Sequence, residues 1–66
     1  MKKKTYKAVI IQPGDDEREP SIRLEDGREF PAGWNMGQTF PVGTEGTAQY
    51  VSTSTIGLWQ FTPTKA

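Results

Sequence analysis

The stretch TAQYVSTSTI (residues 47–56) is one of the two longest segments of this 66-residue chain that lack both proline and glycine, and residues 1–12 are the other. It is rich in β-branched and hydroxyl-bearing residues, which disfavour a helix. Seven glycines and five prolines leave almost no place elsewhere for a helix of about 11 residues, the typical length. Residues 15–19 have a helical composition, but Pro20 ends any helix there after about one turn. The sequence therefore predicts an all-β protein.

Alternating side chains between the turn residues predict five strands, at about 5–12, 21–24, 28–31, 46–52 and 57–62. A sixth strand at 38–42 is a weaker alternative, because Pro41 lacks a backbone donor. Both faces of the first strand become apolar toward its end, as in a strand that is covered on two sides. We expect the core to contain Tyr6, Val9, Ile11, Ile22, Leu24, Phe30, Ala48, Tyr50, Leu58 and Phe61.

The register of the second and third strands follows from the turn between them. A two-residue loop would place Leu24 opposite Glu29. A three-residue loop at 25–27, with Gly27 in the left-handed conformation, places Ile22 opposite Phe30 and Arg23 opposite Glu29. The three-residue loop thus pairs two apolar side chains on one face and two opposite charges on the other. Since such cross-strand pairs stabilise a sheet, we expect this loop.

Short strands without a covering helix must protect their edges, which a small, strongly bent barrel of five or six strands achieves. Residues 40–48 (FPVGTEGTA), followed by LWQF at 58–61, resemble the central part of many SH3-like small barrels. In those, a Gly-x-x-Gly-x-hydrophobic turn leads into a strand that pairs with one carrying alternate aromatics. The resemblance is to a fold and implies no functional residue. We expect an SH3-like barrel, with an OB-like barrel as the alternative, over residues 5–63, flanked by a basic tail at 1–4 and a tail at 64–66.

The chain contains no cysteine and no histidine, which excludes disulfides, His/Cys metal sites and catalysis through imidazole or thiolate. Four of its eight carboxylates lie in residues 15–19, a pattern typical of a solvated loop. We therefore expect no enzyme, cofactor or metal site. The longest apolar run covers residues 8–11, far short of a membrane span, and the basic start lacks the apolar region of a signal peptide. These features predict a cytoplasmic protein without a membrane segment.

Charge is distributed unevenly, since only Glu45 and Lys65 among the charged residues lie beyond residue 30. Aromatic residues are concentrated in that charge-poor half, and such a composition is typical of the centre of an interface. The candidate partner-binding residues are Trp34, Met36, Phe40, Tyr50 and Trp59. Two alternatives stay open: these residues supply the core and strand exteriors, or Trp34 closes one end of the barrel.

Two functions fit this pattern. The first is a non-enzymatic protein-interaction module that binds another protein or a second copy of itself. Regulators, inhibitors and assembly factors act in this way, including small proteins of phages and mobile elements. The alternative is a single-stranded nucleic-acid binder, in which aromatics stack on bases and a basic arm of Lys2, Lys3, Lys4 and Lys7 contacts phosphates. The zero net charge favours the first function.

Overall fold

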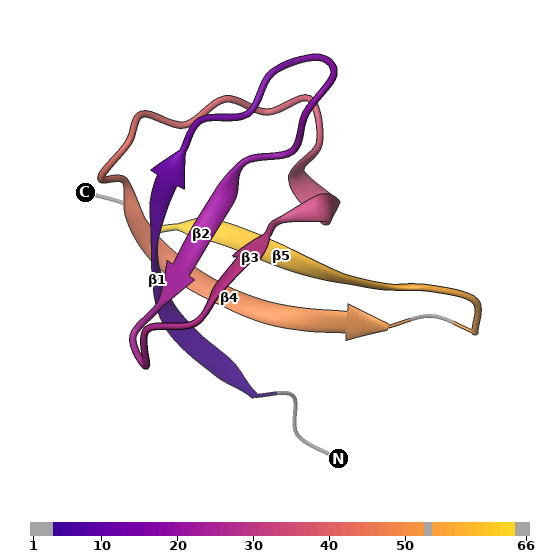
Figure 1. The fold of residues 1–66 in the computed structure, drawn as a ribbon. Helices are drawn as coiled ribbons and strands as arrows, with labels where there is room; N and C mark the ends of the chain where they lie inside the picture. Colours follow the sequence, from indigo (N-terminus) through magenta and orange to yellow (C-terminus); the bar gives the residue numbers. More distant parts are fainter. Residues whose placement is uncertain (1–3, 53, 65–66) are drawn as a thin grey trace.

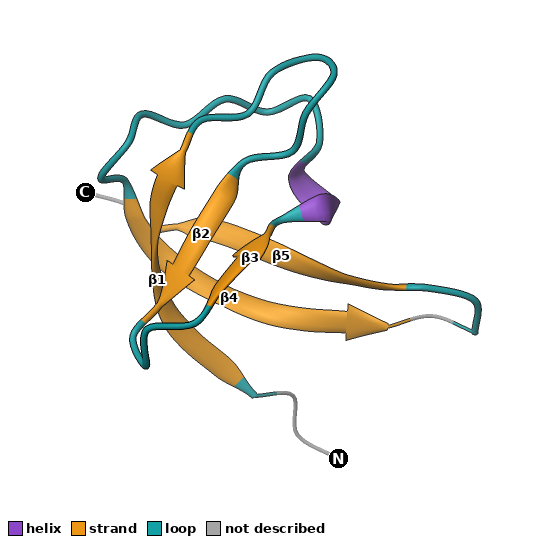
Figure 2. Cartoon of the chain, viewed as in Figure 1, coloured by secondary structure: helices purple, strands orange, loops and turns teal. Residues whose placement is uncertain are grey.

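Five antiparallel strands make up almost all of the regular structure, which confirms the all-β prediction. The computed structural model describes residues 4–52 and 54–64 (Figure 1). Its only helical segment in those ranges is a single 3₁₀ turn, η1, and residues 38–42 form no strand (Figure 2). The elements are β1 (Thr5–Gln12), β2 (Ser21–Leu24), β3 (Glu29–Pro31), η1 (Gly33–Asn35), β4 (Glu45–Ser52) and β5 (Gly57–Pro63).

The strands form one strongly bent sheet in the order β3-β2-β1-β4-β5, with β1 at its centre. In Figure 1 β2 and β3 lie in front of β4 and β5, and the hairpin of β4 and β5 extends beyond the rest of the molecule. The sheet is not closed, because the edge strands β3 and β5 are not hydrogen-bonded to each other. A closed barrel therefore stays a prediction.

The core lies on the inner face of this bent sheet and consists of Ala8, Ile10, Ile22, Leu24, Ala32, Ala48 and Phe61. The expectation that Val9 and Ile11 belong to the core was wrong. Both residues are only half-buried, and their neighbours Ala8 and Ile10 are buried instead. Because β1 is apolar on both faces, alternation alone did not identify its inner face. Tyr50 was also wrongly assigned to the core, since it is 51% exposed, and so was Leu58, which is only half-buried and does not belong to the core cluster.

The hairpin of β2 and β3 has the predicted register. Ile22 pairs with Phe30 and Arg23 pairs with Glu29. The Arg23 guanidinium lies 2.9 Å from the Glu29 carboxylate at a half-exposed position, where such pairs contribute about 0.2–1 kcal/mol. In the turn, the Asp26 carboxylate accepts the backbone N–H of Arg28 at 3.0 Å. This bond lowers the pKa of Asp26, and the Arg28 guanidinium lowers it further.

Gly27 closes this turn with a φ of 95°, as the sequence predicted. A Cβ at Gly27 would meet no atom within 4 Å, so a substitution there tests backbone strain alone. We expect Gly27→Val to lower the free energy of unfolding by about 1–3 kcal/mol in urea denaturation. Gly27→Asn, which tolerates this conformation better, should cost clearly less. Equal stability of the two variants would show that strain is not the cause.

The edge of β5 is covered at one residue by the side chain of Asn35, which ends η1. The Asn35 carboxamide accepts the backbone N–H of Phe61 at 2.7 Å and donates to the Phe61 carbonyl at 3.0 Å. It thus makes the two hydrogen bonds that a neighbouring strand residue would make. Asn35 is only 6% exposed, and it is the one buried polar residue in the described part of the chain. η1 is thereby fixed against β5.

Candidate functional site

Tyr50 and Trp59, two of the expected binding residues, lie in a cluster of four aromatic rings on the inner face of the sheet. Trp59 is its centre: its ring stacks on Phe30 at a centroid distance of 4.8 Å. Tyr6 and Tyr50 approach Trp59 edge-on, at 5.9 Å and 5.6 Å. We call these four residues the aromatic cluster. Its rings come from β1, β3, β4 and β5, so it joins the two ends of the sheet.

Local sequence explains how the cluster forms. Tyr50 and Trp59 are cross-strand partners in the hairpin of β4 and β5, so their side chains share a face. The Tyr50 ring lies against Gly57, where a Cβ would overlap the tyrosine hydroxyl. Tyr6 pairs with Ala48, and the small side chain of Ala48 leaves room for the Trp59 ring beside Tyr6. Sequence analysis placed Tyr6 in the core and did not connect it with the binding residues.

Trp34 and Met36 lie beside β5 but outside the aromatic cluster. Trp34 is in η1 and is 46% exposed, and Met36 directly follows η1 and is 55% exposed. The turn is held close to β5 because Gly33 packs against Leu58, with no space for a Cβ. The structure therefore brings Trp34 to the same strand that carries Trp59, although the two residues are far apart in sequence.

Phe40 has a different setting from the other expected binding residues. Its ring lies edge-on to the buried Phe61 ring at a centroid distance of 5.3 Å. It is half-buried and packs against the core. In the part of the chain that the structure describes, two of the seven aromatic side chains are exposed, Trp34 and Tyr50.

Two cations lie near the aromatic cluster at Tyr6. The Lys4 Nζ is 5.4 Å from the centroid of the Tyr6 ring, and the Arg28 guanidinium is at the same distance from it. Arg28 also forms an ion pair with Asp26 at 2.8 Å. Of the other expected arm residues, Lys7 is exposed on β1, whereas Lys2 and Lys3 lie outside the described residues. The site thus combines aromatic rings with a partly neutralised positive charge.

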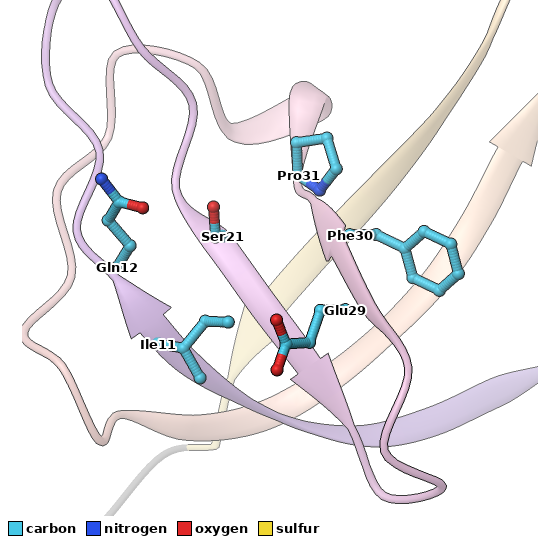
Figure 3. Close-up of a pocket in the computed structure, with 6 residues that line it drawn as sticks. All are labelled: Ile11, Gln12, Ser21, Glu29, Phe30 and Pro31. Atoms are coloured by element: carbon cyan, nitrogen blue, oxygen red, sulfur yellow. The ribbon is translucent and has the colours of Figure 1, made fainter.

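A shallow depression of about 240 Å³ lies on the opposite side of β2 and β3 (Figure 3). Its polar side chains are Gln12, Ser21 and Glu29, and Glu29 is already paired with Arg23. No histidine or cysteine exists to activate Ser21. The depression therefore presents no recognisable catalytic arrangement.

The acidic residues 15–19 form a turn. The Asp15 carboxylate accepts the backbone N–H of Glu17 at 2.8 Å, and the backbones of Asp15 and Arg18 form an antiparallel β-bridge in which each N–H donates to the other's carbonyl. Across residues 4–52 and 54–64, no three acidic side chains gather as metal ligands do. The same residues contain no helix that is long and apolar enough to cross a membrane.

Comparison with known proteins identifies no relative. No family model matches the chain, and no curated protein or solved structure matches it either.

Proposed function

We propose that this chain is a non-enzymatic protein-interaction module that acts in the cytoplasm as a regulator, inhibitor or assembly factor. Its docking surface would be the uncharged surface around β5, made of Trp34, Met36, Tyr50 and Trp59. The observation that carries the proposal is the position of the exposed aromatic rings. Tyr50 pairs with β5 and Trp34 lies on the turn that packs against β5.

Tyrosine and tryptophan are enriched among the few residues that dominate binding energy at protein interfaces. The hairpin of β4 and β5 strengthens the argument, because among residues 46–52 and 54–64 there is no charged side chain. A small domain usually covers a projecting hairpin with charged residues, which keep it soluble. Apart from Glu45 at the first residue of β4, the hairpin is uncharged, and such a segment next to half-exposed aromatic rings fits the centre of an interface.

The strand order supports an OB-like arrangement over the SH3-like one. OB folds have five strands in a partly open barrel. Here five strands form one open, bent sheet, and the Phe30–Trp59 stack joins the inner faces of β3 and β5, the two edge strands. These features favour the OB-like alternative over the SH3-like barrel as the proposed fold.

This arrangement favours a protein partner over a nucleic acid. Oligonucleotide-binding OB folds use a face of the second and third strands together with the loop between the first two strands and the loop between the last two. The outer face of β2 and β3 carries Ser21, Arg23, Glu29 and Pro31, with no aromatic ring for base stacking. The loop between β1 and β2 contains the acidic residues 15–19, which repel phosphates.

The proposal predicts that Tyr50→Ser weakens partner binding. Wild type, Tyr50→Ser and Val42→Ser are each used to capture proteins from source cells, followed by quantitative mass spectrometry. Val42 is the matched control: it is 64% exposed, and it lies in the turn before β4, away from the aromatic cluster. We expect Tyr50→Ser to weaken binding about 30-fold, as loss of about 2 kcal/mol implies, and Val42→Ser to change it little. A partner that both variants retain equally would contradict this surface.

Single-strand nucleic-acid binding is the second candidate, and the cations beside Tyr6 favour it. Lys4 and Arg28 lie where a phosphate next to a stacked base would need them. A salt titration with a labelled oligo(dT) separates the two functions. Nucleic-acid binding should weaken steeply with salt and be lost in Arg28→Gln, whereas a protein-binding module should show no such affinity.

A further inference from the structure

Two cations lie at one end of the aromatic cluster, where Tyr6 of β1 meets the turn between β2 and β3. The Lys4 Nζ and the Arg28 guanidinium each lie 5.4 Å from the centroid of the Tyr6 ring. Arg28 also lies 5.7 Å from the centroid of the Phe30 ring. Both cations are exposed. These contacts give the aromatic cluster a positively charged end.

Arg28 is held in position but keeps donors for a ligand. Its Nε donates to the Asp26 carboxylate at 2.8 Å, and its guanidinium lies over the rings of Tyr6 and Phe30. These three neighbours restrict the movement of the side chain. A guanidinium carries five N–H donors in a rigid fork, and Asp26 engages the one on Nε. The terminal nitrogens of Arg28 are thus able to bind a second carboxylate.

The net charge at this end is small. Among the described residues Lys4 forms no ion pair, whereas Arg28 is paired with Asp26, so the three side chains leave one net positive charge. Lys7 and Glu25 lie next to each other nearby, joined by a backbone hydrogen bond of 2.9 Å, and their charges cancel. A single carboxylate would neutralise this end. A nucleic-acid strand carries a charge on every phosphate and is bound through several cations.

We propose that the docking surface binds a protein segment in which a carboxylate side chain lies within a few residues of an apolar one. This inference rests on the proposed function and names the chemistry of its partner. The apolar side chain would pack on Tyr50 beside Trp59, and the carboxylate would bind Lys4 and Arg28. Tyr6 and Tyr50 both contact the Trp59 ring, so about four residues of extended chain span the two ends.

The distribution of charge favours an acidic segment at this place. Residues 46–52 and 54–64, which include the other end of the cluster, carry no charge that would repel a carboxylate. The acidic residues 15–19 follow the opposite end of β1 (Figure 1). A charge-assisted hydrogen bond is about twice as strong as a neutral one, and complementary charge sets partner choice more than affinity. The two cations would therefore select acidic segments from other apolar ones.

Selection of random peptides displayed on phage tests the proposal with wild type, Lys4→Gln/Arg28→Gln and Lys7→Gln/Arg23→Gln. The last variant is the matched control, because it also removes one lysine and one ion-paired arginine, but from the outer face of the sheet. We expect wild type and this control to enrich peptides with Asp or Glu within about four residues of a large apolar residue. Lys4→Gln/Arg28→Gln should keep the apolar preference and lose the acidic one.

The affinity of one selected peptide gives a quantitative readout. A second peptide carries the amide in place of the carboxylate, and fluorescence anisotropy measures both. The exchange should weaken binding to the wild type about tenfold and binding to Lys4→Gln/Arg28→Gln less than about twofold. An equal loss in the two proteins, or wild-type peptides without an acidic preference, overturns the proposal.

The same selection on Tyr50→Ser separates this inference from the proposed function. Peptides that Tyr50→Ser binds as tightly as the wild type contradict the docking surface itself. Peptides that Tyr50→Ser loses but that show no acidic preference leave the surface in place and overturn the partner chemistry alone. Absence of any enriched peptide also overturns this inference alone, because the proposed function admits a folded partner. Oligo(dT) binding that Lys4→Gln/Arg28→Gln abolishes would show that the two cations serve a phosphate instead.

Discussion

Asn35→Ala should lower the free energy of unfolding by about 2–4 kcal/mol in urea denaturation, because it leaves two buried backbone groups without partners. The carboxamide of Asn35 is bonded to both the N–H and the carbonyl of Phe61, inside the core. Water cannot replace these bonds without entering beside the Phe61 ring. The substitution also releases η1 from β5, so its cost exceeds that of an ordinary surface hydrogen bond.

Two further variants separate this role from a general effect of mutation. Gln38 accepts a hydrogen bond from the Asn35 amide at 2.8 Å but is exposed, so Gln38→Ala should cost less than about 1 kcal/mol. Asn35→Asp keeps the shape but loses the donor to the Phe61 carbonyl. Burial would raise the pKa of the new carboxyl above its value in the unfolded chain. The protonated form can donate, so this variant should be more stable at acid pH and lose stability as pH rises through that raised pKa. A loss below about 1 kcal/mol in Asn35→Ala would contradict the edge-covering role.

The parts of the fold that depend on neighbouring residues were predictable from the sequence. Proline and glycine positions located the five strands to within one residue. The turn at 25–27 fixed the pairing of Arg23 with Glu29, because only one loop length placed like residues on the same face. Local sequence decides such turns, since the conformation of Gly27 and the strand twist leave few alternatives.

Predictions that depended on distant residues were less accurate. The inner face of β1 could not be chosen from its own residues, because Val9 and Ile11 are as apolar as Ile10. Which side chains of β1 are buried is set by which face of the sheet its neighbours β2 and β4 turn inward. Tyr50 was assigned to the core by alternation, and its ring does lie against Trp59 on the inner face, but it is exposed and lies in a hairpin that extends beyond the rest of the molecule. Alternation gives the side of a sheet and does not show where the core ends.

In the candidate site, too, features set by local composition were predicted, and features set by distant contacts were not. The charge-poor half pointed to Trp34, Tyr50 and Trp59, and the structure places all three on or beside β5. The position of Arg28 beside the Tyr6 ring was not predicted. It depends on the turn after β2 lying next to the start of β1, and no local sequence pattern reveals that proximity. Asn35 was missed for a similar reason. A single asparagine between a tryptophan and a methionine carries no signal until its distant partner, Phe61, is known.

Trp59→Ala should cost about 3–5 kcal/mol of unfolding free energy, the range for removing a large aromatic from a packed site. Trp59 is half-buried, yet its ring contacts three other rings that come from three other strands. Its loss would separate Phe30 from the hairpin of β4 and β5. Since β3 and β5 have no backbone hydrogen bonds to each other, the Phe30–Trp59 stack is the ring contact that joins the two edge strands.

Two control variants distinguish this role from the simple removal of apolar surface. Trp59→Phe keeps a ring against Phe30 and should cost clearly less than Trp59→Ala. Trp34→Ala removes a side chain of the same size from a half-exposed turn, and it should cost about 1 kcal/mol or less while weakening partner binding by about 2 kcal/mol. Urea denaturation and a binding assay on the same samples give both quantities. If Trp34→Ala destabilised the fold as much as Trp59→Ala, Trp34 would be a structural closure of the open sheet, and the docking surface would be reduced to Tyr50 and its neighbours.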